Sequence, residues 1–258
     1  IEARKSDIIV LCLGENTYTE KPGDVNDLNL HPLQKELARE LAKTNKPIIL
    51  LINSGRPRII TDIESLSSAT INLYLPGNYG GDALSDILVG KVNPSGKLPY
   101  SYPSYVNSLV PYNFKPSDVQ NNSQGAYNYV GEVNYLYPFG YGLSYSAFEY
   151  SNLEVDKNIY KINDTIKINV NVKNNSSVSG KETIQLYSKD NFATLTPDVK
   201  RLRRFKKIEI DPMETIKVSF NLPVSELSYI NLKNQAEVEP GTFDIMISDI
   251  KKTIEIID

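Results

Sequence analysis

The densest group of side chains suited to acid/base chemistry lies between residues 14 and 24. This segment reads GENTYTEKPGD and carries two carboxylates, Glu15 and Glu20, with Tyr18 between them. General acid/base catalysis needs a positioned carboxyl group and no metal or thiol, and this segment offers two. A solvated loop without function is the commoner fate of an acidic segment, so the elements around it carry the argument further.

The segment is flanked by a predicted strand and a predicted helix. The apolar run Ile8–Leu13 indicates a buried strand, which would also bury Cys12 and leave its thiol inert. Leucines at helical spacing predict a helix over 30–44, with His31 as a cap and Pro32 in its first turn. Loops that leave the carboxyl ends of strands are where open α/β sheets place their ligands.

The same alternation continues after this first helix. We predict strands over 48–52 and 71–75 and helices over 63–68 and 82–89. A β-α-β-α-β order implies a parallel, doubly wound sheet, and all three strand-end loops should then open at one edge. The second of these loops carries Arg56. Three strands are few for such a sheet, so we expect further strands to precede them in a longer protein, of which this chain is a fragment.

The pattern changes near Phe148. From there apolar residues alternate with polar ones, as in the stretch 166–172, and turn residues separate the runs. Short alternating strands at this spacing predict an antiparallel β-sandwich. With no Trp and a single Cys, the sandwich should be of the fibronectin type III kind. We therefore predict two domains, an α/β domain over 1–147 that includes a linker and a sandwich over 148–258.

Composition excludes several classes of partner. The 258 residues carry a formal net charge of −3, and the basic run 200–207 lies within the predicted sandwich, so no nucleic acid is expected. No apolar run is long enough to span a membrane, and no membrane partner is expected. The acids of segment 24–27 lack the glycine and glutamate of an EF-hand loop. We predict no metal site and no cofactor.

Six motifs resemble glycoside hydrolase family 3, the β-glucosidases and β-glucan exohydrolases. GENTYTEKPGDVNDLNL resembles that family's GExxYTExxGDxxxLxL segment. Further matches follow in the family's order: NSGRP at 53–57, LPG with GG at 75–81, NPSGKLP at 93–99, PFGYGLSY at 138–145 and EPG at 239–241. Most of these motifs have structural reasons, since their glycines permit tight turns and close backbone approach.

The resemblance implies a mechanism shared between domains. In that family the nucleophile is an Asp of an N-terminal (β/α)8 barrel, and the general acid/base is a Glu of the second domain. This chain would supply the later part of the second domain and the sandwich, while the barrel remains a missing partner. The implied activity is release of glucose from the non-reducing ends of β-glucosides or β-glucans with retention. The resemblance also implies a secreted or periplasmic protein and a chain that is inactive alone.

Two acids compete for the role of general acid/base. Glu15 lies one residue past the strand, whereas Glu20 lies in mid-loop, where six extended residues reach roughly 20 Å. Glu20 can therefore cross to a neighbouring barrel more easily, and the family's Tyr-Thr-Glu match also falls on it. Glu15 would then orient the loop or pair with Arg56. Tyr18 is a further substrate-binding or loop-orienting candidate.

The polar segment 115–133 is a second place where sugar contacts are expected. Its Tyr127 and Tyr129 could stack on a sugar if the segment lay near the sheet edge that carries Glu20, although a mobile surface loop fits its composition equally well. Two other classes of function stay open. The chain could be a carbohydrate-binding or cell-surface adhesion module, or a structural accessory.

Overall fold

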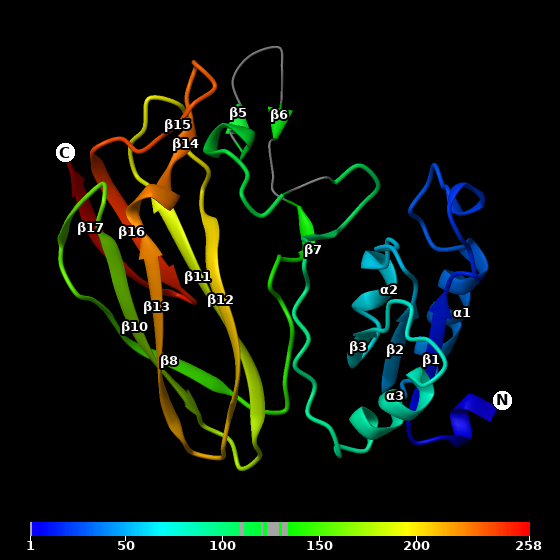
Figure 1. Ribbon diagram of the computed structural model, residues 1–258. Coiled ribbons are helices and arrows are strands. Elements are labelled where there is room, and N and C mark those ends of the chain that lie inside the picture. Colours follow the sequence, from blue (N-terminus) through cyan, green and yellow to red (C-terminus); the bar gives the residue numbers. More distant parts are fainter. Residues whose placement is uncertain (1, 109–110, 120, 123–128, 131–133) are drawn as a thin grey trace. The chain divides into compact units, whose positions relative to one another are not determined.

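The computed structural model describes residues 2–108, 111–119, 121–122, 129–130 and 134–258 (Figure 1). Its contacts divide the chain into two compact units. The first unit comprises Ile1–Lys91, Ser101–Val110 and Asn134–Pro138, and the second comprises Val92–Tyr100, Pro111–Val133 and Phe139–Asp258. The predicted domain boundary near residue 148 refers to parts that fold independently, which contacts alone do not test, so it stays a prediction.

The first unit is built on a parallel sheet. Its strands are β1 (Ile9–Gly14), β2 (Ile48–Asn53) and β3 (Ala69–Asn72), in the order β1-β2-β3. Ile9 pairs with Ile48 and Ile49 pairs with Ala69, both in parallel register. The predicted α/β class with a parallel sheet is confirmed, because each strand returns in the same direction after a helical crossover. A short antiparallel pair, β4 (Tyr102–Pro103) and β7 (Tyr135–Tyr137), also belongs to this unit.

Three α-helices connect and follow these strands: α1 (Pro32–Ala42), α2 (Thr61–Glu64) and α3 (Gly80–Leu88). The cap of α1 is confirmed, since the main-chain N–H of Leu33 donates to Nδ1 of His31 at 3.3 Å. The predicted helix over 63–68 was wrong, because α2 starts earlier and residues beyond Glu64 form turns. The third strand also ends sooner than predicted, ahead of a loop in which Tyr74 has φ 54°. Short 3₁₀ turns cover η1 (Glu2–Lys5) and η2 (Lys21–Gly23).

Strand β1 is buried on one face only, contrary to the prediction of a fully buried strand. Leu11 and Leu13 are buried, whereas Val10 is 50% exposed and Cys12 is also exposed. Successive side chains of a strand point to opposite faces, and β1 packs only the face that carries its odd-numbered residues. The prediction of a buried Cys12 is therefore wrong. In the described part of the chain no helix is long and apolar enough to cross a membrane.

The second unit contains the antiparallel sandwich. One sheet has the order β13-β10-β8, and the other has the order β12-β11-β16-β17-β9, in which β9 joins β17 in parallel. The strands are β8 (Phe148–Val155), β9 (Ile159–Lys161), β10 (Thr165–Asn174), β11 (Gly180–Asp190), β12 (Arg201–Ile210), β13 (Thr215–Pro223), β16 (Gly241–Ile247) and β17 (Ile250–Ile257). Alternate side chains of both sheets, such as Ile168 and Ile245, are fully buried between them. The predicted fibronectin type III-like sandwich is confirmed.

Short elements complete this unit. They are η3 (Pro116–Val119), β5 (Asn121–Asn122), β6 (Tyr129–Val130), η4 (Val224–Leu227), β14 (Tyr229–Ile230) and β15 (Ala236–Glu237). Among the described residues after position 150, η4 is the only helix, and it has four residues.

Two earlier motifs pack on the sandwich as part of the second unit. Lys97 of NPSGKLP lies 3.2 Å from Glu182 of β11 and donates to the main-chain oxygen of Gly142 at 2.7 Å. The hydroxyl of Tyr150 donates to the same Glu182 at 2.9 Å, and burial raises the pKa of Tyr150 far above its usual range. Gly142 must be glycine, because a Cβ there would lie 2.0 Å from the main-chain oxygen of Gly96. These motifs therefore have a structural role: they attach the segments around residues 97 and 142 to β11 of the sandwich.

Candidate active site

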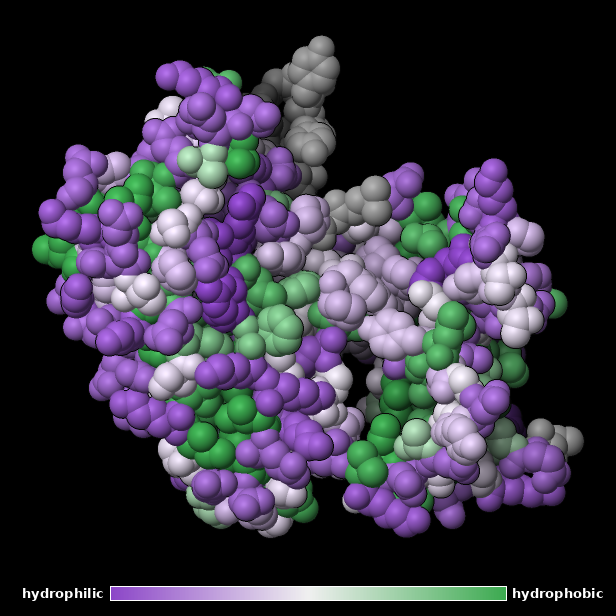
Figure 2. Space-filling view, viewed as in Figure 1, coloured by the Kyte–Doolittle hydropathy of each residue, from purple (hydrophilic) through white to green (hydrophobic). Residues whose placement is uncertain are grey.

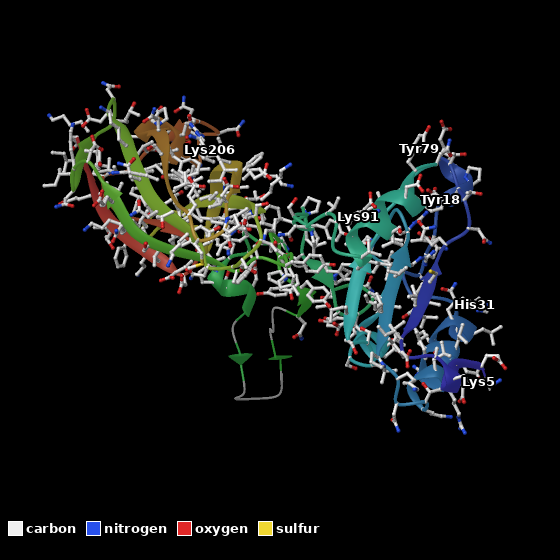
Figure 3. The ribbon with its side chains drawn as sticks, turned by 90° about the horizontal axis from the view of Figure 1, so that it is seen from below. Lys5, Tyr18, His31, Tyr79, Lys91 and Lys206 are labelled. Atoms are coloured by element: carbon white, nitrogen blue, oxygen red, sulfur yellow. The ribbon has the colours of Figure 1, made fainter. Side chains whose placement is uncertain are left out.

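Three loops of the first unit meet at the carboxyl ends of its parallel strands. The loop after β1 contributes Tyr18, the loop after β2 contributes Gly55, and the loop after β3 contributes Leu75. A Cβ built on Gly55 would lie 2.4 Å from the Tyr18 hydroxyl and 3.1 Å from Leu75. Figure 3 shows Tyr18 and Tyr79 at this same end of the unit. The predicted convergence of strand-end loops is thus present in the structure.

Glu15 is locked at the base of the first loop. Its side chain is 8% exposed and accepts hydrogen bonds from the hydroxyl of Ser54 and from Nη2 of Arg58. Nε of Arg56 lies 3.2 Å from the same carboxylate. Two guanidinium groups therefore compensate one nearly buried carboxylate, which suits Glu15 for positioning the loop. Sequence reasoning named Arg56 as a partner for Glu15, and the structure contains that ion pair.

Arg58 and Ser54 were missed by sequence reasoning. Arg58 also donates through Nη1 to the main-chain oxygens of Asp27, at 2.8 Å, and of Asn29, at 3.2 Å. These bonds hold the return of the first loop against the loop after β2. The signal in the sequence was weak: Ser54 lies within the NSGRP motif and Arg58 directly follows it, and no pattern distinguishes either from ordinary loop residues.

Arg56 joins the aromatic side chain of the loop to its base. Its guanidinium carbon lies 4.1 Å from the centre of the Tyr18 ring, and Nη2 donates to the main-chain oxygen of Gly23 at 2.6 Å. The pKa of Arg56 is raised, first by its side-chain interaction with Tyr18 and then by the charge of Glu15, with desolvation opposing. A Cβ on Gly23 would lie 2.5 Å from the Tyr18 ring. Tyr18 is therefore held in one place by a cation–π contact and two glycines.

Glu20 differs from Glu15 in exposure, in pairing and in backbone conformation. It is exposed, and within the described residues its carboxylate has no hydrogen bond or ion pair. Its backbone has φ 48° and ψ −142°, a conformation that is unusual for a residue with a side chain and costs about 1–3 kcal/mol. Its main-chain oxygen accepts from the N–H of Gly23 at 2.9 Å, which closes the η2 turn. The strained turn thus presents a free carboxyl group on a loop anchored at its base.

The positions of two further predicted site residues, Tyr127 and Tyr129, stay predictions. Tyr127 lies outside the described residues, and for Tyr129 the structure describes only its backbone in β6. The expectation that their loop approaches Glu20 stays a prediction. Among the described residues no three His, Cys, Asp or Glu side chains gather as metal ligands would.

We expect Glu15→Gln to destabilise the protein strongly. The change keeps the shape of the side chain but leaves Arg56 and Arg58 without a counter-charge, and breaking a buried ion pair costs about 3–5 kcal/mol. Urea unfolding gives the free-energy difference. The control is Glu40→Gln, which removes an exposed ion pair with Lys43 and should cost less than about 1 kcal/mol. Equal losses in both variants would contradict a special role for Glu15.

Comparisons with known proteins cover nearly the whole chain. Residues 1–145 match the Glycosyl hydrolase family 3 C-terminal domain, and residues 182–249 match the Fibronectin type III-like domain. A lysosomal beta glucosidase of Dictyostelium discoideum is 36% identical over 96% of this chain, which covers 30% of that protein. A beta-xylosidase of Formosa agariphila is 35% identical over 98% of this chain, which covers 35% of that protein.

A solved structure shows the same arrangement of elements. The beta-glucosidase of Listeria innocua in complex with gluconolactone superposes on 98% of this chain with a TM-score of 0.90 and 30% identity. The superposed part is 37% of that protein. The chain thus spans about a third of the length of the relatives it matches.

Proposed function

The chain belongs to glycosyl hydrolase family 3, and we propose that it contributes the general acid/base, Glu20, to a retaining β-glucosidase. The nucleophile would be an Asp of an N-terminal (β/α)8 barrel, and the substrates would be β-glucosides or β-glucans cleaved at their non-reducing ends. The observation that carries the proposal is the contrast between two glutamates. Glu15 forms ion pairs with Arg56 and Arg58, whereas Glu20 is exposed and, among the described residues, unpaired on the same loop.

The chemistry asked of Glu20 follows from its setting. In the first step its protonated carboxyl group would donate to the departing glycosidic oxygen, and in the second step its carboxylate would accept a proton from water. A retaining enzyme needs the two carboxyl groups roughly 5 Å apart. Glu20 lies in mid-loop, from which it could extend towards a nucleophile on another domain, whereas Glu15 is held at the end of β1 by its partners. The secreted or periplasmic location remains a prediction.

The stereochemistry of the first product tests this function. We expect a protein that joins this chain to the N-terminal barrel to release β-glucose first from an aryl β-glucoside, before mutarotation, as followed by proton NMR. An aryl β-xyloside run in parallel tests the other substrate class found among the relatives. Initial release of α-glucose would exclude retention. Binding of the glucoside without hydrolysis would favour the carbohydrate-binding module over the enzyme.

A further inference from the structure

A charged cavity lies on the sandwich, within the second unit. It has a volume of about 200 Å³ and is lined by Ser188 and Asp190 of β11, by Arg201 and Arg203 of β12, and by Lys115 and Tyr229 among others. Figure 2 shows strongly hydrophilic side chains gathered over the region of β12. None of these residues has a part in the proposed acid/base chemistry.

A β-bulge places Arg203 at this cavity. Leu186 pairs with Arg204 and Tyr187 pairs with Leu202, so Arg203 is the extra, unpaired residue between them. A bulge of this kind redirects a side chain away from strict alternation. As a result Nε of Arg203 donates to the hydroxyl of Ser188 at 2.8 Å, and Ser188 is the residue paired with Arg201. The bulge therefore brings two guanidinium groups, Arg201 and Arg203, to one cavity.

The hydrogen bonds of Arg203 go to neutral acceptors. Apart from Ser188, it donates to the main-chain oxygen of Glu226 at 2.5 Å. The Glu226 carboxylate is taken by both terminal nitrogens of Arg204, at 2.7 and 2.6 Å. Within the described residues no carboxylate forms an ion pair with Arg203. Burial lowers the pKa of Arg203, and the like charge of Arg201 lowers it further. The charges of Glu226 and Asp198 act in the opposite direction and offset this lowering only in part.

The acids on the cavity wall are already satisfied. Asp198 is 9% exposed and accepts from Arg201 at 2.7 Å and from Asn113 at 3.2 Å, while Lys115 lies at 2.8 Å. Asp190 accepts a hydrogen bond from the main-chain N–H of Phe192 at 3.1 Å. Neither carboxylate is a partner of Arg203. An anion that entered the cavity would further offset the desolvation of this partly buried cation.

We infer that this cavity binds a small oxyanion between Arg201 and Arg203, supplied either by the carboxylate of an acidic sugar or by free phosphate. Arginine matches both groups, because its parallel N–H donors fit two oxygens at once. The volume is below the roughly 300–1,000 Å³ of sites for drug-sized ligands, which limits the occupant to about one sugar ring or a free anion. This binding function is independent of the acid/base role of Glu20.

Isothermal titration of the 258-residue chain with sodium glucuronate, with inorganic phosphate and with neutral glucose tests the inference. We expect at least one anion to bind and glucose to give no heat. Glucuronate alone would identify an acidic sugar as the ligand, and phosphate alone would identify the free anion. Absence of binding by both anions would overturn the inference.

Matched variants locate the site. Arg203→Gln should weaken anion binding at least tenfold, and Arg201→Gln should do the same without disturbing the bulge. Lys206→Gln removes an equal charge from the same strand, where Nζ donates to the main-chain oxygen of Ser219 outside the cavity. It should leave the affinity within about twofold. Thermal melts confirm that each variant is folded. Equal losses in all three variants would show diffuse attraction to a basic strand and would overturn the site.

Discussion

Glu20→Ala, in a protein that joins this chain to the barrel, should nearly abolish cleavage of cellobiose-like substrates. The loss should be about 10²–10⁴-fold, the usual contribution of general acid/base catalysis. Aryl glucosides with acidic phenols should keep a fast first step, because a good leaving group departs without a proton. A leaving-group series under steady-state and single-turnover conditions measures both effects.

The second step of the same variant should be rescued by a small anion. Without a base to activate water, a glycosyl-enzyme should accumulate. Azide needs no base assistance, so it should speed turnover and yield the β-glycosyl azide. The intermediate can be followed by intact-protein mass spectrometry, and the product by NMR.

Glu15→Ala is the matched control for Glu20→Ala. It removes a carboxylate from the same loop, but one that is held by Ser54, Arg56 and Arg58. We expect it to lower stability or to weaken all substrates alike, with no dependence on the leaving group and no azide rescue. If Glu15→Ala shows dependence and rescue while Glu20→Ala shows neither, the two roles must be exchanged.

The second large effect concerns the chain on its own. The purified 258-residue chain should not hydrolyse aryl β-glucosides above a buffer blank, because the proposed nucleophile belongs to the barrel and one carboxyl group cannot perform a double displacement. Release of phenol over hours, at high chain concentration, is the measurement.

Addition of the barrel, fused or as a separate chain, should restore turnover. The Glu20→Ala chain with the same barrel is the control for carry-over of a contaminating glucosidase, since a contaminant would ignore the substitution. Turnover by the chain alone that disappears in Glu20→Ala would show that the catalytic machinery is complete without a barrel.

Local sequence patterns predicted most strands and helices. They missed the features that depend on contacts between distant parts of the chain. The order of apolar runs was enough to predict a parallel sheet, and Pro32 directly after His31 was enough to predict the start of α1. The partners of Glu15 could not be predicted in full, because Ser54 and Arg58 lie 39 and 43 residues away from it. Exposure of Cys12 depends on whether a second layer covers β1, which the hydrophobicity of the strand does not reveal.

The site on the sandwich was invisible for a different reason. A prediction from alternation assumes that every second side chain of β12 lies on the same face. The bulge at Arg203 adds one residue to the strand and redirects its side chain. The run 200–207 therefore appeared as a uniform basic stretch. The positive φ of Glu20 could not be predicted either, because the usual sign of such a backbone is a glycine and this residue is a glutamate.

The interleaving of the two units bears on the order in which the protein can fold as it is synthesised. Three segments of each unit alternate along the chain, and Asn93 bonds to Ser179, 86 residues later, while Lys207 reaches back 112 residues to Ser95. Chains emerge from the ribosome at about 5–20 residues per second. Lys97 can bond to Gly142, 45 residues later, before its ion pair with Glu182 of β11 is possible. The bonds of Asn93 to Ser179 and of Lys207 to Ser95 can form only when β11 and β12 have been synthesised, several seconds later.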